Sequence, residues 1–141
     1  MKKLISIISC FVLLVSSCGC SLVDNSTQGK VYAVSGDFDF EAYSVKVAEN
    51  GELLPGYDMS SIVSEMDADV PYNDDFMIKL EGTVYGNPTY AIYSEELENY
   101  YENAESLTIP EAEGTKIVKI RVTWGDEDKN ASYDYFFKLI R

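Results

Sequence analysis

The chain has 141 residues, of which 46% are hydrophobic, 13% aromatic and 25% charged, a composition typical of one globular domain. It holds 24 acidic residues against 11 Lys and Arg, and the resulting net charge of −13 disfavours binding to a nucleic-acid backbone. It has no histidine, which excludes the commonest general base, the commonest zinc ligand and every His-activated nucleophile. We therefore expect no nucleic-acid partner, no cofactor and no enzymatic activity.

The first segment has the pattern of a secretion signal. Lys2 and Lys3 give it a positive start, and about 12 mostly apolar residues follow from Leu4 to Val15. A membrane-spanning helix needs about 20 such residues, so this run has the size of a signal-peptide core. We expect residues 1–17 to be removed, which leaves 9 basic and 24 acidic residues and a net charge of −15.

The end of this segment carries a family resemblance. Val15-Ser16-Ser17-Cys18 resembles the lipobox of bacterial lipoproteins, in which an aliphatic and two small residues precede a cysteine. The resemblance implies cleavage after Ser17 and a diacylglycerol group on the Cys18 sulfur. Each buried CH₂ of such an anchor adds about 0.8 kcal/mol, so we expect a permanently membrane-anchored, extracytoplasmic protein. Residues 18–29 are the expected flexible tether, and Cys20 alone cannot form a disulfide within the domain.

Strand signals dominate from residue 30 onward, where β-branched and aromatic residues alternate with polar ones between turn residues. The pattern predicts strands over 30–35 and 38–48. Asn50-Gly51 predicts a type I′ hairpin turn, since both residues tolerate a positive φ, with a short return over 52–54. Residues 30–141 are therefore expected to form one β domain.

The following segment interrupts the strands. Asp58 or Ser60 is placed to cap one or two helical turns that run to Met66, where apolar residues recur at helical spacing. An acidic loop is expected over 67–75.

The middle of the chain predicts a second hairpin and a second helix. Residues 76–85 alternate as a strand, Gly86-Asn87 forms a two-residue turn, and 89–93 return. Ser94 then caps a helix over 95–105 with one apolar stripe, and a short strand is expected over 107–109.

The C-terminal region gives the clearest pattern. Two alternating runs lie on either side of a polar turn at 125–130, and their apolar residues predict one face of an antiparallel hairpin: Val118, Ile120, Val122, Trp124, Tyr133, Tyr135, Phe137 and Leu139. With six to eight strands in about 110 residues, the sequence predicts an all-β antiparallel sandwich with one or two short connecting helices.

This region also resembles the last two strands of immunoglobulin-like domains from bacterial surface proteins. The resemblance rests on Gly114, which precedes an alternating run from Ile117 to Ile120, and it covers residues 110–141. It implies that the sandwich is immunoglobulin-like.

A candidate binding patch follows from the register of the middle hairpin. A turn at Gly86-Asn87 places Glu81 opposite Ile92 and leaves the less apolar face outward. That face holds Tyr85, Tyr90, Ile92 and Glu81. Tyrosine is common on binding surfaces because it is rigid and amphipathic, but it is also common in strands. Alternatively, a helical segment covers this face as a further layer.

One acidic strand is a candidate for catalysis. Asp37, Asp39 and Glu41 alternate with phenylalanines, which places three carboxylates on one face about 7 Å apart. Paired carboxylates hydrolyse glycosides, so a small hydrolase is a remote alternative. A polar outer face explains the same pattern more simply.

Two further acidic groups are candidates for metal binding. The run 126–130 matches the first five positions of an EF-hand loop, but Ala131 and Phe137 stand where that loop needs glycine and a bidentate carboxylate. A hairpin turn explains the run as well, and Asp67, Asp69, Asp74 and Asp75 fit a solvated loop. No metal site and no catalytic residue is predicted.

Together these features predict a lipid-anchored, non-enzymatic binding module at the cell surface. Its partner is expected to be another surface protein, with a glycan bound by outward tyrosines as the alternative.

Overall fold

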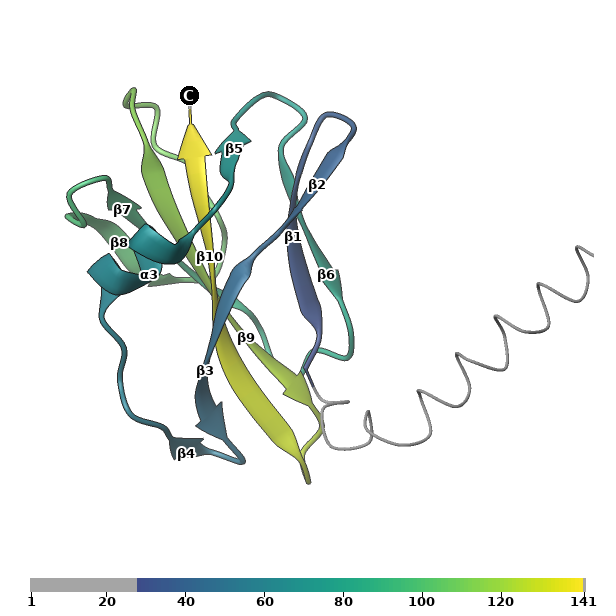
Figure 1. Cartoon of the computed structure of the whole chain (residues 1–141). Helices are drawn as coiled ribbons and strands as arrows, with labels where there is room; N and C mark the ends of the chain where they lie inside the picture. The colour runs from purple at the N-terminus through teal and green to yellow at the C-terminus, as the bar shows by residue number, and fades with distance from the viewer. Residues whose placement is uncertain (1–27, 141) are drawn as a thin grey trace, which may run out of the picture.

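The computed structural model describes residues 28–140 (Figure 1), so the predicted signal peptide, Cys18 and Cys20 lie outside the described residues. The strands are β1 (Lys30–Ser35), β2 (Phe38–Glu41), β3 (Tyr43–Glu49), β4 (Glu52–Leu53), β5 (Asp69–Pro71), β6 (Met77–Glu81), β7 (Thr89–Ser94), β8 (Asn99–Ala104), β9 (Lys116–Gly125) and β10 (Asn130–Ile140). The helix is α3 (Met59–Glu65).

Two sheets form the predicted sandwich. A three-stranded sheet in the order β2-β1-β6 packs on a seven-stranded sheet in the order β4-β3-β10-β9-β7-β8, in which β5 also pairs with β10 (Figure 1). All pairings are antiparallel except that of β5 with β10. The prediction of an all-β antiparallel sandwich with a short helix is confirmed, while the resemblance to immunoglobulin-like domains stays a prediction.

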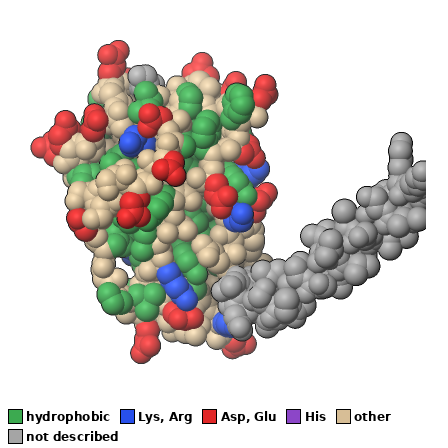
Figure 2. Space-filling model, in the orientation of Figure 1, with side chains coloured by type: hydrophobic (Ala, Val, Ile, Leu, Met, Phe, Trp, Pro, Cys, Tyr) green, Lys and Arg blue, Asp and Glu red, His purple; other side chains and the backbone are tan. Residues whose placement is uncertain are grey.

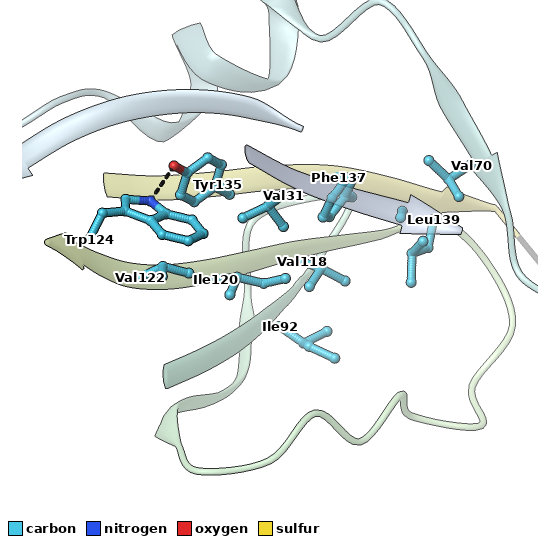
Figure 3. Close-up of a cluster of buried hydrophobic side chains, with 11 residues drawn as sticks. Val31, Val70, Ile92, Val118, Ile120, Val122, Trp124, Tyr135, Phe137 and Leu139 are labelled. Carbon is cyan, nitrogen blue, oxygen red and sulfur yellow. Dashed lines mark hydrogen bonds between the residues drawn. The ribbon is translucent and has the colours of Figure 1, made fainter. Parts of the chain in front are cut away.

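The C-terminal hairpin forms the centre of the core, as its alternation predicts. Val118 lies opposite Phe137 and Ile120 opposite Tyr135, and these side chains are buried between the sheets (Figure 3). Trp124 is 0% exposed, and its indole Nε1 donates a hydrogen bond of 2.6 Å to the Tyr135 hydroxyl. That hydroxyl donates in turn to the Gly29 carbonyl at 2.9 Å, which ties the start of β1 to the core.

The helix covers part of the outer face of the larger sheet. Asp58 caps it, because its Oδ1 accepts the Ser60 N–H at 3.4 Å, and Ile62 packs against Ile117 and Phe136 on that face. The predicted capped helix is confirmed, and it makes a partial third layer. Among the described residues, no helix has the length and apolar character required to cross a membrane.

The first half of the chain differs from the prediction in two places. The predicted strand 38–48 is divided at Ala42, where the chain passes from the smaller sheet to the larger one. The predicted acidic loop contains β5, whose Val70 is buried opposite Leu139. The Asn50-Gly51 hairpin is confirmed, with φ of 48° and 83° at its two residues.

The predicted hairpin at Gly86-Asn87 is wrong. β6 pairs with β1 in one sheet and β7 pairs with β8 and β9 in the other, so residues 82–88 cross between the sheets. The crossing begins at Gly82, with a φ of 138°, and its Val84 bridges to Trp124. Tertiary packing around Trp124 thus prevails over a local turn signal.

The predicted second helix is also wrong. Residues 94–98 form a tight turn, in which the Ser94 N–H donates to the Glu98 carbonyl at 2.8 Å, and β8 returns alongside β7. Tyr101, placed on the predicted helical stripe, packs against the core from a strand instead. The predicted strand 107–109 is irregular.

Candidate binding groove

The four residues of the predicted binding patch do not share a surface. Ile92 is 0% exposed and lies in the core opposite Val118, which contradicts its predicted outward position. Glu81 is on the smaller sheet, whereas Tyr85 lies in the crossing between the sheets and is 43% exposed. Tyr90 is half-buried against the core. The patch depended on the hairpin register, so it fails with the hairpin.

Tyr90 does line an open groove of about 290 Å³. Its lining side chains are all aliphatic or aromatic, while backbone groups and the tyrosine hydroxyls add polar surface. The lining residues come from β6, β7 and two loops: Tyr72, Phe76, Met77, Ile78, Tyr90, Leu107 and Ile109. The Tyr72 and Phe76 rings contact each other with centroids 5.4 Å apart. This groove is the described feature that best fits recognition of another molecule.

Hydrogen bonds fix the first wall of the groove, residues 71–76. The buried Ser35 hydroxyl donates to the Pro71 carbonyl at 2.6 Å and accepts from the Asn73 amide at 3.0 Å. The Phe76 N–H donates to the Asn73 carbonyl at 3.1 Å, and the Tyr72 N–H donates to the Ile140 carbonyl at 2.8 Å. These contacts hold the two aromatic rings in place without a long strand.

A single tyrosine fixes the second wall, which carries Leu107 and Ile109. The Tyr101 hydroxyl donates to the Thr108 carbonyl at 2.8 Å and accepts the Thr108 N–H at 2.9 Å. Burial raises the pKa of Tyr101, so the hydroxyl keeps its proton and both hydrogen bonds. The irregular backbone between β8 and β9 is thereby positioned against the groove.

The groove lies between acidic segments. The stretches 69–81 and 105–113, which supply most of its lining, together hold seven carboxylates and one lysine. That lysine, Lys79, pairs with Asp39 and lies 3.9 Å from Glu81. Figure 2 shows the same imbalance on the visible face of the domain, where acidic side chains far outnumber Lys and Arg. The groove therefore combines an apolar lining with acidic surroundings.

The carboxylates considered for hydrolysis face lysines. Asp39 pairs with Lys79, and Glu41 lies 3.3 Å from Lys30, so the two acids do not form a pair of their own. The hydrogen bonds that the two lysines donate to these carboxylates raise the pKa of each lysine above its usual value. This arrangement is that of a charged outer sheet face, and it supplies no acid–base pair.

The run 126–130 forms a closed turn. Asp126 Oδ1 accepts the N–H groups of Asp128 and Lys129, both at 2.9 Å, and its own N–H donates to the Lys129 carbonyl. The loop 67–75 holds an exposed ion pair, in which Asp69 lies 3.8 Å from Lys138. Within residues 28–140, no three Asp, Glu, Cys or His side chains converge closely enough to hold a metal ion.

One carboxylate, Asp134, is fully buried on the outer side of the larger sheet. It accepts two hydrogen bonds from Arg121, of 2.7 and 2.8 Å, and one of 2.5 Å from the Tyr57 hydroxyl. Burial and the bond to Asp134 raise the pKa of Tyr57 far above its usual value. Because its partners occupy both oxygens, Asp134 fastens the segment before α3 to the sheet rather than serving as a free acid.

The sequence prediction included Tyr90 but missed the other groove residues. Tyr72 lies within the predicted acidic loop, Phe76 begins the predicted strand 76–85, and Leu107 and Ile109 lie in a segment expected to pair as a strand. Large apolar residues within short polar segments were the available signal. No protein-family model, no curated protein and no solved structure gives a match to this chain.

Proposed function

We propose that this chain is a lipid-anchored, non-enzymatic binding module outside the cytoplasm, and that it engages another surface protein through the apolar groove. The observation that carries the proposal is an apolar groove with aromatic rings in an otherwise strongly acidic protein. A groove in which aromatic and aliphatic side chains gather is a typical place for binding, which supports the proposal.

The position of the groove supports this function. The chain enters the described domain at Gly29, beside Trp124, whereas Met77 in the groove lies opposite Val34 near the far end of β1. At about 3.4 Å per residue, these two ends of β1 are about 15–20 Å apart. A domain tethered before Gly29 would thus present the groove away from the point of attachment.

The lining of the groove favours a protein partner over a sugar or a small molecule. The volume of about 290 Å³ is just below the range of about 300–1,000 Å³ for small-molecule pockets. Among the lining side chains only the two tyrosines carry a hydrogen-bonding group, so most of the side-chain contacts that the groove offers are apolar. Side chains of a protein segment match an apolar lining better.

The anchor is tested at Cys18. In the Cys18→Ala variant we expect the protein to leave the membrane fraction and to accumulate as uncleaved precursor or soluble protein. Intact-mass measurement of the unsubstituted protein checks the lipid directly. An unlipidated mature chain that starts at another residue would contradict the anchor.

Photo-crosslinking in intact cells tests the binding function. A photoreactive residue replaces Met77, which is 57% exposed in the groove, and a control replaces Leu53, which is 83% exposed on β4. We expect a discrete protein adduct from position 77 and none from position 53. A glycan adduct, no adduct at position 77, or equal adducts at both positions would contradict the proposal.

A further inference from the structure

The groove lies alongside an unpaired strand edge. β6 is at the margin of the smaller sheet, and within the described part of the chain only β1 pairs with it. Two of its residues, Met77 and Ile78, also line the groove. An unpaired strand edge is a template for a further strand, and a neighbouring groove can receive the side chains of that strand.

The hydrogen-bond register shows which backbone groups face the open edge. The Ala42 N–H donates to the Val31 carbonyl at 2.9 Å, so the backbone groups of Val31 point toward β2. Those of its neighbour Tyr32 therefore point toward β6, where Tyr32 lies opposite Lys79. Since direction alternates along a strand, the N–H and C=O groups of Ile78 and Leu80 face the open edge.

We propose that β6 binds an extended segment of the partner protein as an added antiparallel strand, with alternate apolar side chains in the groove and basic side chains toward the acidic surroundings. This inference rests on the proposed function and names the chemistry of its partner. In the added strand, the partner residues opposite Ile78 and Leu80 exchange backbone hydrogen bonds with them. Their side chains point to the same face of the sheet as Ile78 and Leu80, which is the core side. These partner residues are therefore the apolar ones.

The charges on and around β6 determine which partner residues alternate with these apolar ones. The partner residue opposite Glu81 is basic, and so is the one opposite Met77, because Asp74 and Asp75 shortly precede Met77 along the chain. The residue opposite Lys79 is uncharged, because like charges directly opposite each other destabilise a pair. The matching antiparallel sequence reads Lys-Val-Thr-Val-Lys from its N-terminus at Glu81.

Two features distinguish β6 from β8, the edge strand of the larger sheet. The apolar groove borders β6, whereas no residue of β8 lines it. Lys79, which would otherwise protect this edge, is turned onto the sheet face, where it pairs with Asp39 and lies 4.7 Å from the centre of the Tyr32 ring. The β6 edge is thus left accessible.

The test uses the full chain in detergent micelles and the capped peptide Lys-Val-Thr-Val-Lys as the probe, followed by NMR. We expect binding with slowed hydrogen exchange at the Ile78 and Leu80 amides. The Lys79 amide, already bonded to β1, should be unchanged. A matched peptide with Glu in place of both Lys should bind at least about tenfold more weakly, a difference that salt reduces.

N-methylated peptides separate strand addition from simple contact. Methyl groups on the two Val nitrogens remove the edge hydrogen bonds and should weaken binding at least about tenfold. A methyl group on the Thr nitrogen, which faces away from β6, should change affinity by less than about twofold. Equal effects of the two methylations would overturn strand addition.

The remaining outcomes separate this inference from the proposed function. Peptide binding without protection at Ile78 and Leu80 overturns strand addition but leaves the groove as a binding site. Failure of the basic peptide to bind overturns the inference, and the intact-cell adduct at position 77 then decides the proposed function on its own.

Discussion

The two ends of the sandwich carry grooves of similar size that differ in the side chains that line them. The groove at the Trp124 end, about 320 Å³, is lined by glycines and polar residues: Gln28, Gly29, Gly82, Thr83, Gly125, Asp126 and Lys129. The groove at the other end, about 290 Å³, is lined by aromatic and aliphatic side chains. The difference indicates that one end stabilises the fold and the other is available for recognition.

At the Trp124 end, the backbone at Gly29 and Gly82 packs directly against the Trp124 ring. A Cβ atom added at Gly29 would meet the Glu81 carbonyl at 2.4 Å and the Trp124 ring at 2.5 Å, so only glycine fits there. The indole N–H donates to the Tyr135 hydroxyl, which donates to the Gly29 carbonyl, and the two rings meet edge to face with centroids 6.2 Å apart. At this end the packing and the hydrogen bonds therefore depend on the same few residues.

At the groove end, loops replace strands. The walls depend on side-chain hydrogen bonds from Ser35, Asn73 and Tyr101 rather than on long strand pairing. The lining keeps large apolar groups in contact with solvent, and Met77 is 57% exposed. Substitutions at this end should therefore affect binding more than stability.

The largest effect is expected from emptying the Trp124 end. Trp124→Ala should lower the free energy of unfolding by about 3–5 kcal/mol, the usual range for removing a buried large aromatic side chain. The total stability of a domain is about 5–15 kcal/mol, so the variant is expected to be near unfolding. Urea denaturation measures the loss, and a value below about 1 kcal/mol would contradict the assignment of this end.

A smaller loss is expected from overfilling the same end. Gly29→Ala places a methyl group against the Glu81 carbonyl and the indole ring, and should cost about 1–3 kcal/mol. Gly56→Ala is the matched control, because an added Cβ there meets no atom within 4 Å. The control should stay within about 0.5 kcal/mol of the original protein. Equal losses of unfolding free energy in both variants would contradict the close packing around Gly29.

Alkaline pH should weaken the Trp124 end without a substitution. Burial raises the pKa of Tyr135 to about 12, whereas an unfolded tyrosine has a pKa of about 10. The folded state holds the proton more tightly, so this stability is complete below pH 10 and is lost as the pH rises from about 10 to about 12. Burial raises the pKa of Tyr93 and Tyr57 in the same direction.

Urea denaturation between pH 8 and pH 12, with absorbance of the tyrosinate form, checks this linkage. Tyr135→Phe is less stable at neutral pH, but its stability should fall less between about pH 10 and pH 12. An equal alkaline loss in this variant and in the original protein would contradict the role of Tyr135.

The sequence predicts the fold best where one pattern repeats over a long strand. The alternation from Val118 to Trp124 identifies the core face, and Asn50-Gly51 identifies its turn, because both signals are local and agree with the packing. Asp58 likewise identifies the start of α3.

Prediction from the sequence fails where contacts between residues far apart along the chain determine the local structure. Gly86-Asn87 has the chemistry of a hairpin turn, but Gly82 turns the chain across to the other sheet because it packs against Gly29 and Trp124. The segment 95–105 has a helical stripe, but its Tyr101 is held in a strand by β7 and by Thr108. The candidate site depends on these distant contacts. Of the four predicted patch residues, only Tyr90 lines the groove, and the hairpin register from which it was predicted is wrong.

One measurement tests the division between the two ends most directly: the partner adduct formed by a chemical crosslinker in intact cells, compared between two variants. Met77→Arg adds a positive charge to the apolar groove, opposite the basic residue of the partner strand, and Thr83→Arg adds the same charge to the groove at the Trp124 end. Both residues are exposed, so each variant should keep its stability within about 0.5 kcal/mol. We predict at least about a tenfold loss of adduct, equivalent to about 1.4 kcal/mol of binding, for Met77→Arg and no loss for Thr83→Arg. Loss of the adduct with Thr83→Arg, or its retention with Met77→Arg, would contradict the account.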